Sequence, residues 1–282
     1  MATPRLPTML LVVAGAAGVA LGLYAAVLAL LWWGQERLLF LPAVLPADHR
    51  FEHGADVHET WVEVPGARLN ALHLRLPEPD GVVFFLHGNA GSLQNWFTGG
   101  DFYRRTNMDL FIFDYRGYGK SSGRIESQAQ LEGDVRIAWR QVEAYYRTHH
   151  AGRIGQPGFK RVVYGRSLGT GLASSLAAEL QPELTVLVSP FESMHAIARA
   201  HYPWVPAPLL RYPLRNAEAL ARVKTPVLLA HGGLDELIPP HHSLALKAVA
   251  PHAQLLVVPE AGHGDIHEFP LYLDALAGAM RR

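Results

Sequence analysis

Ser167 lies in a run of residues that favours a nucleophilic serine. The run Arg161-Val-Val-Tyr-Gly-Arg-Ser-Leu-Gly-Thr-Gly171 begins as a β-branched strand and leads into a helical stretch over Leu168–Leu180. Gly165 and Gly169 flank the turn between them, where larger side chains would clash, and the serine hydroxyl is left exposed at the start of the helix. The arrangement predicts covalent catalysis by the hydroxyl of Ser167.

A second G-x-S-x-G pattern shows how weak the bare motif is. Gly119-Lys-Ser-Ser-Gly123 also matches, but it follows Asp114-Tyr-Arg-Gly-Tyr-Gly and precedes no immediate apolar run. This composition is typical of a polar loop with turn residues. Only Ser167 has the strand and the helix that the turn requires.

A hydroxyl nucleophile needs a base and a group that orients the base, and both occur further along the chain. The strand Val227–Ala230 runs into His-Gly-Gly-Leu-Asp235, and the strand that ends near Val258 runs into Pro-Glu-Ala-Gly-His263. Loops at the carboxyl ends of parallel strands gather at one edge of a sheet. The order Ser167, Asp235, His263 is the order expected for a hydrolase of this topology.

Less specific interpretations of these residues stay open. Ser167 could be a turn residue, Asp235 a helix cap and His263 an ordinary loop histidine. The rival carboxylates for the orienting role are Glu236, Asp265 and Asp114. His263 and His267 have the spacing of a helical metal pair, but no third ligand follows and His263 precedes the helix, so neither a metal nor a cofactor is expected.

The composition agrees with a compact enzyme, and nothing in it favours nucleic acid as a partner. Of the 282 residues, 49% are hydrophobic and 18% are charged, which is too apolar for a disordered chain. Lys and Arg number 25, as do Asp and Glu, so there is no basic surplus to bind phosphates. The absence of cysteine excludes disulfides, thiolate metal sites and a cysteine nucleophile.

The N-terminus predicts a single membrane-spanning anchor. Met9–Trp33 contains 25 residues without a charge, which as a helix would be roughly 37 Å long and would cross a hydrocarbon core of about 30 Å. A secretory signal has a shorter apolar region, so an uncleaved anchor is favoured. Arg5 and Arg37 flank the stretch on opposite sides and favour neither orientation of the domain.

The remaining chain predicts an α/β domain with a mainly parallel, doubly wound sheet. We expect an anchor over 1–36, a surface connector over 37–56 and the domain over 57–282. Continuous apolar runs suit strands that are buried on both faces, and the first two strands form a hairpin through Pro65-Gly66. The expected strands are Thr60–Val64, Arg68–Leu76, Val82–Leu86, Leu110–Phe113, Val162–Tyr164, Leu184–Val188, Val227–Ala230 and Gln254–Val258; the expected helices are Leu93–Arg105, Ser127–Tyr146, Leu168–Leu180, Ser243–Ala250 and Ile266–Met280.

From about Val57 to the C-terminus the chain resembles the α/β-hydrolase superfamily. Besides the segments of Ser167, Asp235 and His263, the run Val82-Val-Phe-Phe-Leu-His-Gly-Asn-Ala-Gly-Ser92 resembles that family's oxyanion loop. The resemblance implies that the backbone N–H groups of Asn89 and Leu168 stabilise the oxyanion. The lipase-type His-Gly-Gly-Gly signature is absent.

The Asp114-Tyr-Arg-Gly-Tyr-Gly-Lys-Ser-Ser-Gly segment and the apolar N-terminus together resemble membrane-anchored serine hydrolases, which include lysophospholipases and protein depalmitoylases. This looser resemblance implies ester or thioester substrates, with lipids or acylated molecules favoured. A peptidase or amidase with the same three residues is one alternative. A non-catalytic, membrane-tethered binding protein is another.

A long insertion separates two of the expected strands, and its composition bears on the substrate. Ser189–Thr225 contains the apolar, proline-rich run His201-Tyr-Pro-Trp-Val-Pro-Ala-Pro-Leu-Leu-Arg-Tyr-Pro213. It could form a lid or acyl groove in which Trp204, Leu209 and Leu210 contact substrate or bilayer, or a short helix packed on the core. Arg166, beside the nucleophile, is a candidate for an anionic head group.

Overall fold

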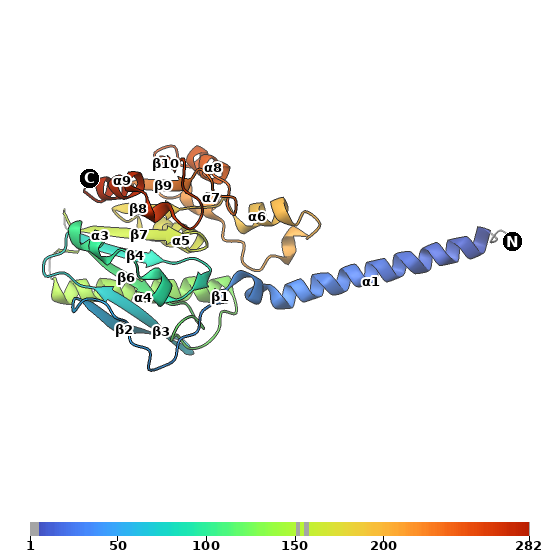
Figure 1. Cartoon of the computed structure of the whole chain (residues 1–282). Coiled ribbons are helices and arrows are strands. Elements are labelled where there is room, and N and C mark those ends of the chain that lie inside the picture. Colours follow the sequence, from blue (N-terminus) through green and yellow to red (C-terminus); the bar gives the residue numbers. More distant parts are fainter. Residues whose placement is uncertain (1–5, 151–152, 155–157, 282) are drawn as a thin grey trace.

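The strands form one mainly parallel sheet. The computed structural model describes residues 6–150, 153–154 and 158–281. Within them, the main sheet has the order β10-β9-β8-β7-β4-β6-β3-β2 (Figure 1), and only the β2–β3 and β3–β6 pairs are antiparallel. The predicted doubly wound sheet with an N-terminal hairpin is confirmed. Its strands are β2 (Val57–Val64), β3 (Ala67–Leu74), β4 (Gly81–Leu86), β6 (Met108–Phe113), β7 (Lys160–Arg166), β8 (Leu184–Val188), β9 (Val227–Gly232) and β10 (Gln254–Val258).

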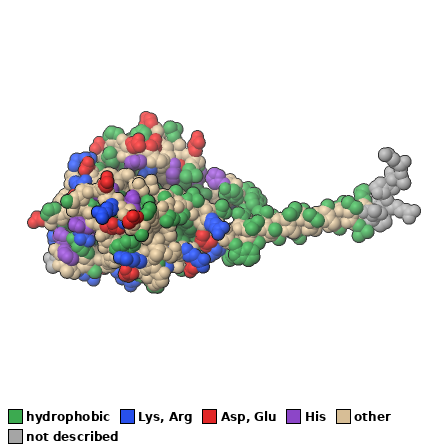
Figure 2. Space-filling view, turned by 60° about the horizontal axis from the view of Figure 1, so that its bottom comes forward, with side chains coloured by type: hydrophobic (Ala, Val, Ile, Leu, Met, Phe, Trp, Pro, Cys, Tyr) green, Lys and Arg blue, Asp and Glu red, His purple; other side chains and the backbone are tan. Residues whose placement is uncertain are grey.

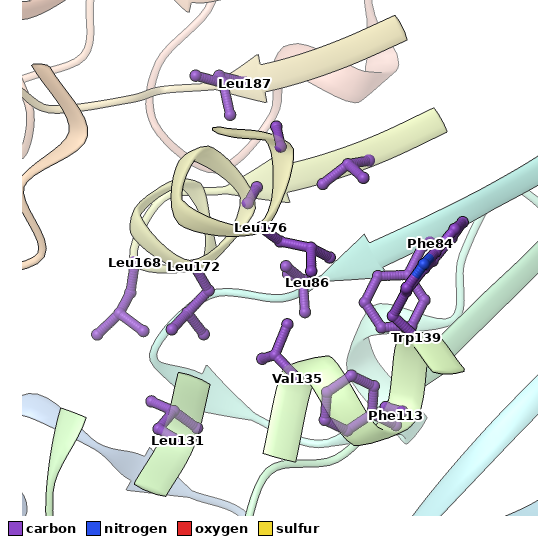
Figure 3. Packing of buried hydrophobic residues seen from close by; sticks show 14 of the residues in the cluster. Phe84, Leu86, Phe113, Leu131, Val135, Trp139, Leu168, Leu172, Leu176 and Leu187 are labelled. Carbon is purple, nitrogen blue, oxygen red and sulfur yellow. The ribbon is translucent and has the colours of Figure 1, made fainter. Parts of the chain in front are cut away.

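Helices cover both faces of the sheet, because successive residues of each strand point to opposite sides. In β4, Val82, Phe84 and Leu86 belong to one core cluster, and Val83 and Phe85 belong to the other. The first cluster also takes residues from α4 (Gln128–His149), α5 (Gly169–Leu180) and α8 (His241–Val249), and the second from α3 (Gly100–Arg105) and α9 (Pro270–Arg281). Figure 3 shows the first cluster between β4, α4 and α5.

Two of the expected helices are interrupted. The expected helix Leu93–Arg105 is instead α2 (Leu93–Trp96) followed by α3, because Gly99 adopts a left-handed φ of 70° between them. The expected helix Ile266–Met280 is a 3-10 turn, η2 (Ile266–Glu268), followed by α9. Pro270 starts α9, since proline fits the first turn of a helix but not its interior.

The N-terminal helix α1 (Leu6–Leu39) continues without a break from the apolar stretch to the domain (Figure 1). It is long and apolar enough to cross a membrane, and its apolar stretch is exposed. The segment expected as a surface connector begins inside this helix and then joins a sheet. Leu41–Pro42 forms β1, which pairs in parallel with β5 (Ala90–Gly91). Phe40, between the end of α1 and the start of β1, is 6% exposed and belongs to the first core cluster.

The insertion between β8 and β9 contains short helices. These are α6 (Met194–His201), the 3-10 turn η1 (Ala207–Leu209) and α7 (Asn216–Leu220). No described residue of α6 or η1 is buried, whereas Asn216, Ala219 and Leu220 of α7 are. The insertion therefore packs on the first core cluster through Met194 and Ile197 of α6, leaves the core around η1 and returns to it at Tyr212 and Leu214, before α7.

Candidate active site

Ser167 occupies a strained turn between β7 and α5. Its φ is 52°, a left-handed value that a non-glycine residue rarely adopts. The turn is held by backbone hydrogen bonds, because the Ser167 N–H donates to the Val188 carbonyl at 2.9 Å and the Thr170 hydroxyl donates to the Ser167 carbonyl at 2.6 Å. Strain that the fold maintains at one residue is typical of a functional site.

The two glycines of the motif are required by close packing. A Cβ on Gly165 would lie 2.6 Å from the Ala173 Cβ, and a Cβ on Gly169 would collide with the carbonyl oxygen of Leu86. The helix that starts at Gly169 therefore sits directly against the end of β4. This packing explains the glycine spacing from which the turn was predicted.

The three residues predicted to do chemistry meet in one chain of hydrogen bonds. Ser167 Oγ lies 3.0 Å from His263 Nε2, and His263 Nδ1 lies 2.8 Å from Asp235 Oδ2. The carboxylate only accepts, so Nδ1 carries the proton and Nε2 is free to accept from the serine hydroxyl. The residues follow β7, β9 and β10, so the parallel sheet brings together positions that are 96 and 28 residues apart.

Asp235 is 3% exposed and is held ionised by its hydrogen bonds. Burial alone would raise the pKa of Asp235, but donation from His231, His263 and the backbone N–H of Ile238 lowers that pKa below its ordinary value. Its Oδ1 accepts from the N–H groups of Leu237 and Ile238 at 3.1 and 2.8 Å. One carboxylate oxygen is thus fixed by the loop and the other faces the imidazole.

His231 supports Asp235 from the end of β9. Its Nε2 lies 2.7 Å from the Ile238 carbonyl and 3.4 Å from Asp235 Oδ2, and both of these partners accept. Its Nδ1 lies 2.6 Å from the Ser243 hydroxyl, which then donates to it. The sequence placed His231 in the same motif as Asp235 without a role. Its position four residues before the acid, directly after a strand, was the available signal.

Arg166 faces the loop that carries His263. Its Nη2 donates to the carbonyls of His263 and Gly264 at 3.2 and 2.6 Å, and its Nη1 lies 3.3 Å from His267 Nδ1. The guanidinium carbon also lies 5.5 Å from the ring centroid of Trp96. These contacts point to a positioning role for Arg166; contact with a substrate head group stays a prediction.

The segment predicted as the oxyanion loop lies beside Ser167. A Cβ built on Gly88 would lie 3.7 Å from the Ser167 Cβ and 2.9 Å from the Trp96 ring. The Asn89 carbonyl accepts from the Leu41 N–H at 2.8 Å and from the Tyr118 hydroxyl at 2.6 Å. The chain that follows α1 therefore supports this loop directly. Gly88 and Trp96 are site residues that sequence reasoning missed, and for Trp96 no local pattern gave a signal.

Leu168, the second predicted oxyanion donor, anchors the start of α5. Its side chain is 5% exposed and belongs to the first core cluster (Figure 3). Its backbone occupies the position just before α5, where peptide N–H groups at a helix start have no partner within the helix. An anionic oxygen beside Ser167 would find such donors there.

Two of the rival carboxylates, Asp265 and Asp114, have other partners. Asp265 Oδ1 accepts from the Gly262 N–H at 2.7 Å, inside the loop of His263. Asp114 is fully buried at the end of β6, where its Oδ1 accepts from the Leu93 N–H at 2.9 Å and lies 3.6 Å from His87 Nε2. Burial raises the pKa of Asp114 to about 7, although the hydrogen bond from Leu93 opposes the shift. Among the residues that the structure describes, Asp235 is the one that contacts His263 Nδ1.

The insertion residues with predicted substrate contacts lie beside α1. Trp204 is 49% exposed, and its carbonyl accepts from the Tyr24 hydroxyl at 2.7 Å. Leu209 and Leu210 are partly buried, and the Leu209 carbonyl accepts from Gln35 Nε2 at 3.0 Å. The structure thus brings these three residues to the N-terminal helix. Their contact with a substrate stays a prediction.

Comparison with known proteins gives matches over most of the chain. Residues 77–216 match the family model described as serine aminopeptidase, S33. An uncharacterized protein of Mycobacterium tuberculosis is 32% identical over 271 residues, which cover 92% of this chain and 90% of that protein. Alpha/beta hydrolase domain-containing protein 17B of Homo sapiens is 30% identical over 216 residues, which cover 75% of this chain and 70% of that protein.

Solved structures share the arrangement of the domain. An esterase of Pyrococcus furiosus aligns with a TM-score of 0.63 at 18% sequence identity, covering 86% of this chain and 97% of that chain. At this identity the likeness concerns the fold. The sheet and its helices are therefore a known scaffold, on which the residues at the carboxyl ends of the strands determine the chemistry.

Proposed function

Because this chain belongs to the α/β-hydrolase superfamily, we propose that it is a membrane-anchored serine hydrolase that cleaves carboxylic esters or thioesters. Its fold is the α/β-hydrolase fold. In this proposal Ser167 is the nucleophile, His263 the general base and acid, and Asp235 the group that orients the imidazole. The observation that carries it is the Ser167–His263–Asp235 hydrogen-bond chain.

The geometry supports acyl transfer in two steps. Ser167 Oγ attacks the substrate carbonyl while His263 Nε2 takes the hydroxyl proton, and the resulting imidazolium stays paired with the ionised Asp235. His263 then gives the proton to the leaving alcohol or thiol, and an acyl-serine remains. Water attacks this ester with His263 again as base, which releases the acid and restores Ser167.

We assign the oxyanion to the N–H groups of Leu168 and Asn89. The position of Leu168 just before α5 and the contact between Gly88 and Ser167 support this assignment. Loss of one such donor typically costs about 2.7–4 kcal/mol of transition-state stabilisation. The donors are backbone groups, so their supports are the useful targets for mutation. For Asn89 the supports are the Leu41 N–H and the Tyr118 hydroxyl.

A lipid or acylated substrate is favoured by the apolar surroundings. The exposed α1 and the apolar insertion lie side by side, which suits a substrate that partitions into membranes (Figure 1). Uncleaved anchoring is supported by Tyr24, whose hydroxyl donates to the Trp204 carbonyl at 2.7 Å. Cleavage of a signal after the small residues around Ala25 or Ala29 would remove this contact.

A serine-reactive fluorophosphonate probe tests the enzyme directly. We expect the full-length protein to be labelled and Ser167→Ala to lose all labelling, while Ser122→Ala, which alters an exposed serine within the second G-x-S-x-G pattern, keeps it. Absence of labelling in folded wild-type protein would instead favour a non-catalytic binding protein. Persistent labelling of Ser167→Ala would assign the nucleophile to another residue.

Amide hydrolysis is the second candidate, because the matched family model is described as a serine aminopeptidase. The same three residues would cleave an amide if His263 protonated the leaving amine. Rates of the full-length protein on esters, thioesters and aminoacyl amides of matched acyl length distinguish the two. We expect the esters and thioesters to be cleaved fastest, and faster cleavage of the aminoacyl amides would overturn the ester assignment.

A further inference from the structure

The last turns of α1 hold the insertion by polar contacts on both sides of Leu210. Gln35, which is 7% exposed, donates from Nε2 to the Leu209 carbonyl at 3.0 Å and accepts at Oε1 from the Arg211 N–H at 2.7 Å. Glu36 accepts from the Arg211 guanidinium at 2.6 Å and from the Tyr212 hydroxyl at 2.8 Å. Gln35 and Glu36 at this end of α1 thus both contact the insertion.

A further contact lies closer to the N-terminus of the same helix. The Tyr24 hydroxyl donates to the Trp204 carbonyl at 2.7 Å, and the two rings are 6.5 Å apart in an edge-on arrangement. Tyr24 and Gln35 are eleven residues apart, so the insertion runs beside α1 for about 16 Å. Figure 1 shows this segment alongside the part of α1 nearest the domain.

The segment Tyr202–Leu210 has an apolar, uncharged surface. Its sequence is Tyr-Pro-Trp-Val-Pro-Ala-Pro-Leu-Leu, and Tyr202 and Trp204 are 56% and 49% exposed. Figure 2 shows hydrophobic side chains gathered where the domain meets α1. The apolar surface of α1 therefore continues onto this segment.

The position of Tyr24 within the membrane-spanning stretch indicates that lipid covers the apolar surface of Tyr202–Leu210. A hydrocarbon core of about 30 Å takes about 20 helical residues, and every such window within Met9–Trp33 includes Tyr24 at least four residues, or about 6 Å, from its end. If α1 spans a bilayer through this stretch, Trp204 beside Tyr24 lies below the hydrocarbon surface of the same leaflet.

The backbone of the segment suits a medium without water, where polar backbone groups need partners. Three of its residues are prolines, which have no N–H to satisfy. Five of its nine carbonyls accept hydrogen bonds, which come from the segment itself, from His195 and from α1. The carbonyls with partners are those of Tyr202, Trp204, Pro206, Ala207 and Leu209.

We propose that Tyr202–Leu210 is a second membrane-contacting element, fixed against α1 and buried in the same leaflet. It rests on the proposed anchoring of α1, and it deepens the proposed function by giving the acyl chain of a substrate a lateral route from that leaflet. The segment leads through Tyr212 and Leu214 to Asn216, whose side chain donates to the Thr170 hydroxyl behind Ser167 at 3.0 Å. The segment and the turn that carries the nucleophile are thus parts of one connected structure.

The chain has no cysteine, so single-cysteine variants can report the depth of chosen sites. We would label Ala207→Cys in the segment, Ala20→Cys in α1 and Ala144→Cys on the exposed face of α4 with an environment-sensitive fluorophore. Each full-length protein is reconstituted in phosphatidylcholine vesicles. Quenching by nitroxide lipids and by aqueous iodide is then measured.

We expect the Ala207 label to match the Ala20 label, with blue-shifted emission, strong quenching by nitroxide lipids and little quenching by iodide. The Ala144 label should show the opposite. Iodide quenching of the Ala207 label equal to that of the Ala144 label would overturn the proposal, and so would shielding from both quenchers, which indicates a protein partner. Iodide access at Ala20 would overturn the anchoring itself, whereas a loss of hydrolysis alone would leave these readings unchanged.

The fixing by α1 is tested with the same label. Tyr24→Phe and Gln35→Leu remove the hydrogen bonds to Trp204, Leu209 and Arg211, so iodide quenching of the Ala207 label should increase in the double variant and less in Tyr24→Phe alone. The Ala20 label should not change. Unaltered quenching at Ala207 in the folded double variant would show that α1 does not fix the segment.

Discussion

The edge of the sheet that carries Ser167, Asp235 and His263, here called the catalytic edge, and the insertion of the same domain are held in place by different means. Ser167 and Asp235 are 7% and 3% exposed and are fixed by backbone hydrogen bonds at the ends of buried strands. The insertion has no buried residue in α6 or η1, and side chains of α1 hold it. In the proposed function, the chemistry therefore depends on the core of the domain, and access of the substrate depends on the contacts between the insertion and α1.

The largest effect is expected from Asp235→Asn at the catalytic edge. An asparagine can keep its oxygen on the Leu237 and Ile238 N–H groups, which turns its NH₂ toward His263 and stabilises the tautomer that cannot accept the serine proton. We expect kcat to fall on the order of 10⁴-fold while the protein stays folded. Steady-state kinetics and thermal unfolding check both parts.

Asp265→Asn is the matched control for that variant. Its side-chain oxygen can still accept from the Gly262 N–H, so kcat should stay close to the wild-type value. A collapse of kcat in Asp265→Asn with little change in Asp235→Asn would assign the orienting acid to the rival carboxylate.

Arg166→Gln sharpens the description of the catalytic edge. The variant loses donors to the carbonyls of His263 and Gly264, so the imidazole should be less well placed. We expect kcat to fall by roughly 10²-fold with little change in KM, because small misplacements of catalytic groups have effects of that order. A rise in KM confined to substrates with anionic head groups would show instead that Arg166 binds the substrate.

Alanine at Trp204, Leu209 and Leu210 together tests the insertion. Loss of these side chains should lower kcat/KM by about tenfold on long-chain esters and by less on short-chain esters, since only long chains reach the apolar surface. The control replaces Leu244, Val249 and Val257, which are exposed and apolar but lie outside the insertion. Equal losses on both chain lengths would reject an acyl-binding role.

The smallest effect on catalysis is expected at Asp114, at the end of β6, where the predicted change is in the free energy of unfolding. Burial raises the pKa of Asp114 to about 7, so the folded protein keeps this proton from about pH 4 to pH 7 while the unfolded chain loses it. Its contribution to the free energy of unfolding therefore falls as pH rises through that window. Asp114→Asn cannot titrate and should gain about 2 kcal/mol relative to wild type between pH 5 and pH 8.

Urea unfolding of both proteins in detergent at the two pH values measures that difference. Subtracting the free energy of unfolding of one protein from that of the other cancels the titration of other buried groups. Asp109 is such a group, because burial raises its pKa to about 6. A difference that does not change with pH would mean that Asp114 is ionised in the folded protein throughout this range.

The sheet and the positions of Ser167, Asp235 and His263 could be predicted because each depends on a local pattern. Buried parallel strands are continuous apolar runs, and the loops at their carboxyl ends must meet at one edge. The break of the expected helix Leu93–Arg105 was also encoded locally, by the Gly99-Gly100 pair, and was missed because the flanking residues favour a helix.

The contacts of α1 could not be predicted in this way. Gln35 and Glu36 resemble ordinary polar residues at the end of an apolar helix, and their partners lie more than 170 residues away. The same holds for Leu41, whose N–H reaches the Asn89 carbonyl through a two-residue strand that is too short for any periodicity. Such contacts are set by the tertiary fold rather than by sequence pattern.

The unbroken passage of α1 into β1 leaves no flexible tether between the helix and the domain. A catalytic domain on a loose linker would sample many heights and tilts above a bilayer, but here Phe40 and Leu41 are fixed in the domain one and two residues after the helix ends. With α1 in a bilayer, Ser167 would stay at a constant distance from the membrane surface. Substrates would then be sorted by how far their scissile bond stands from the lipid surface, in addition to their chemistry.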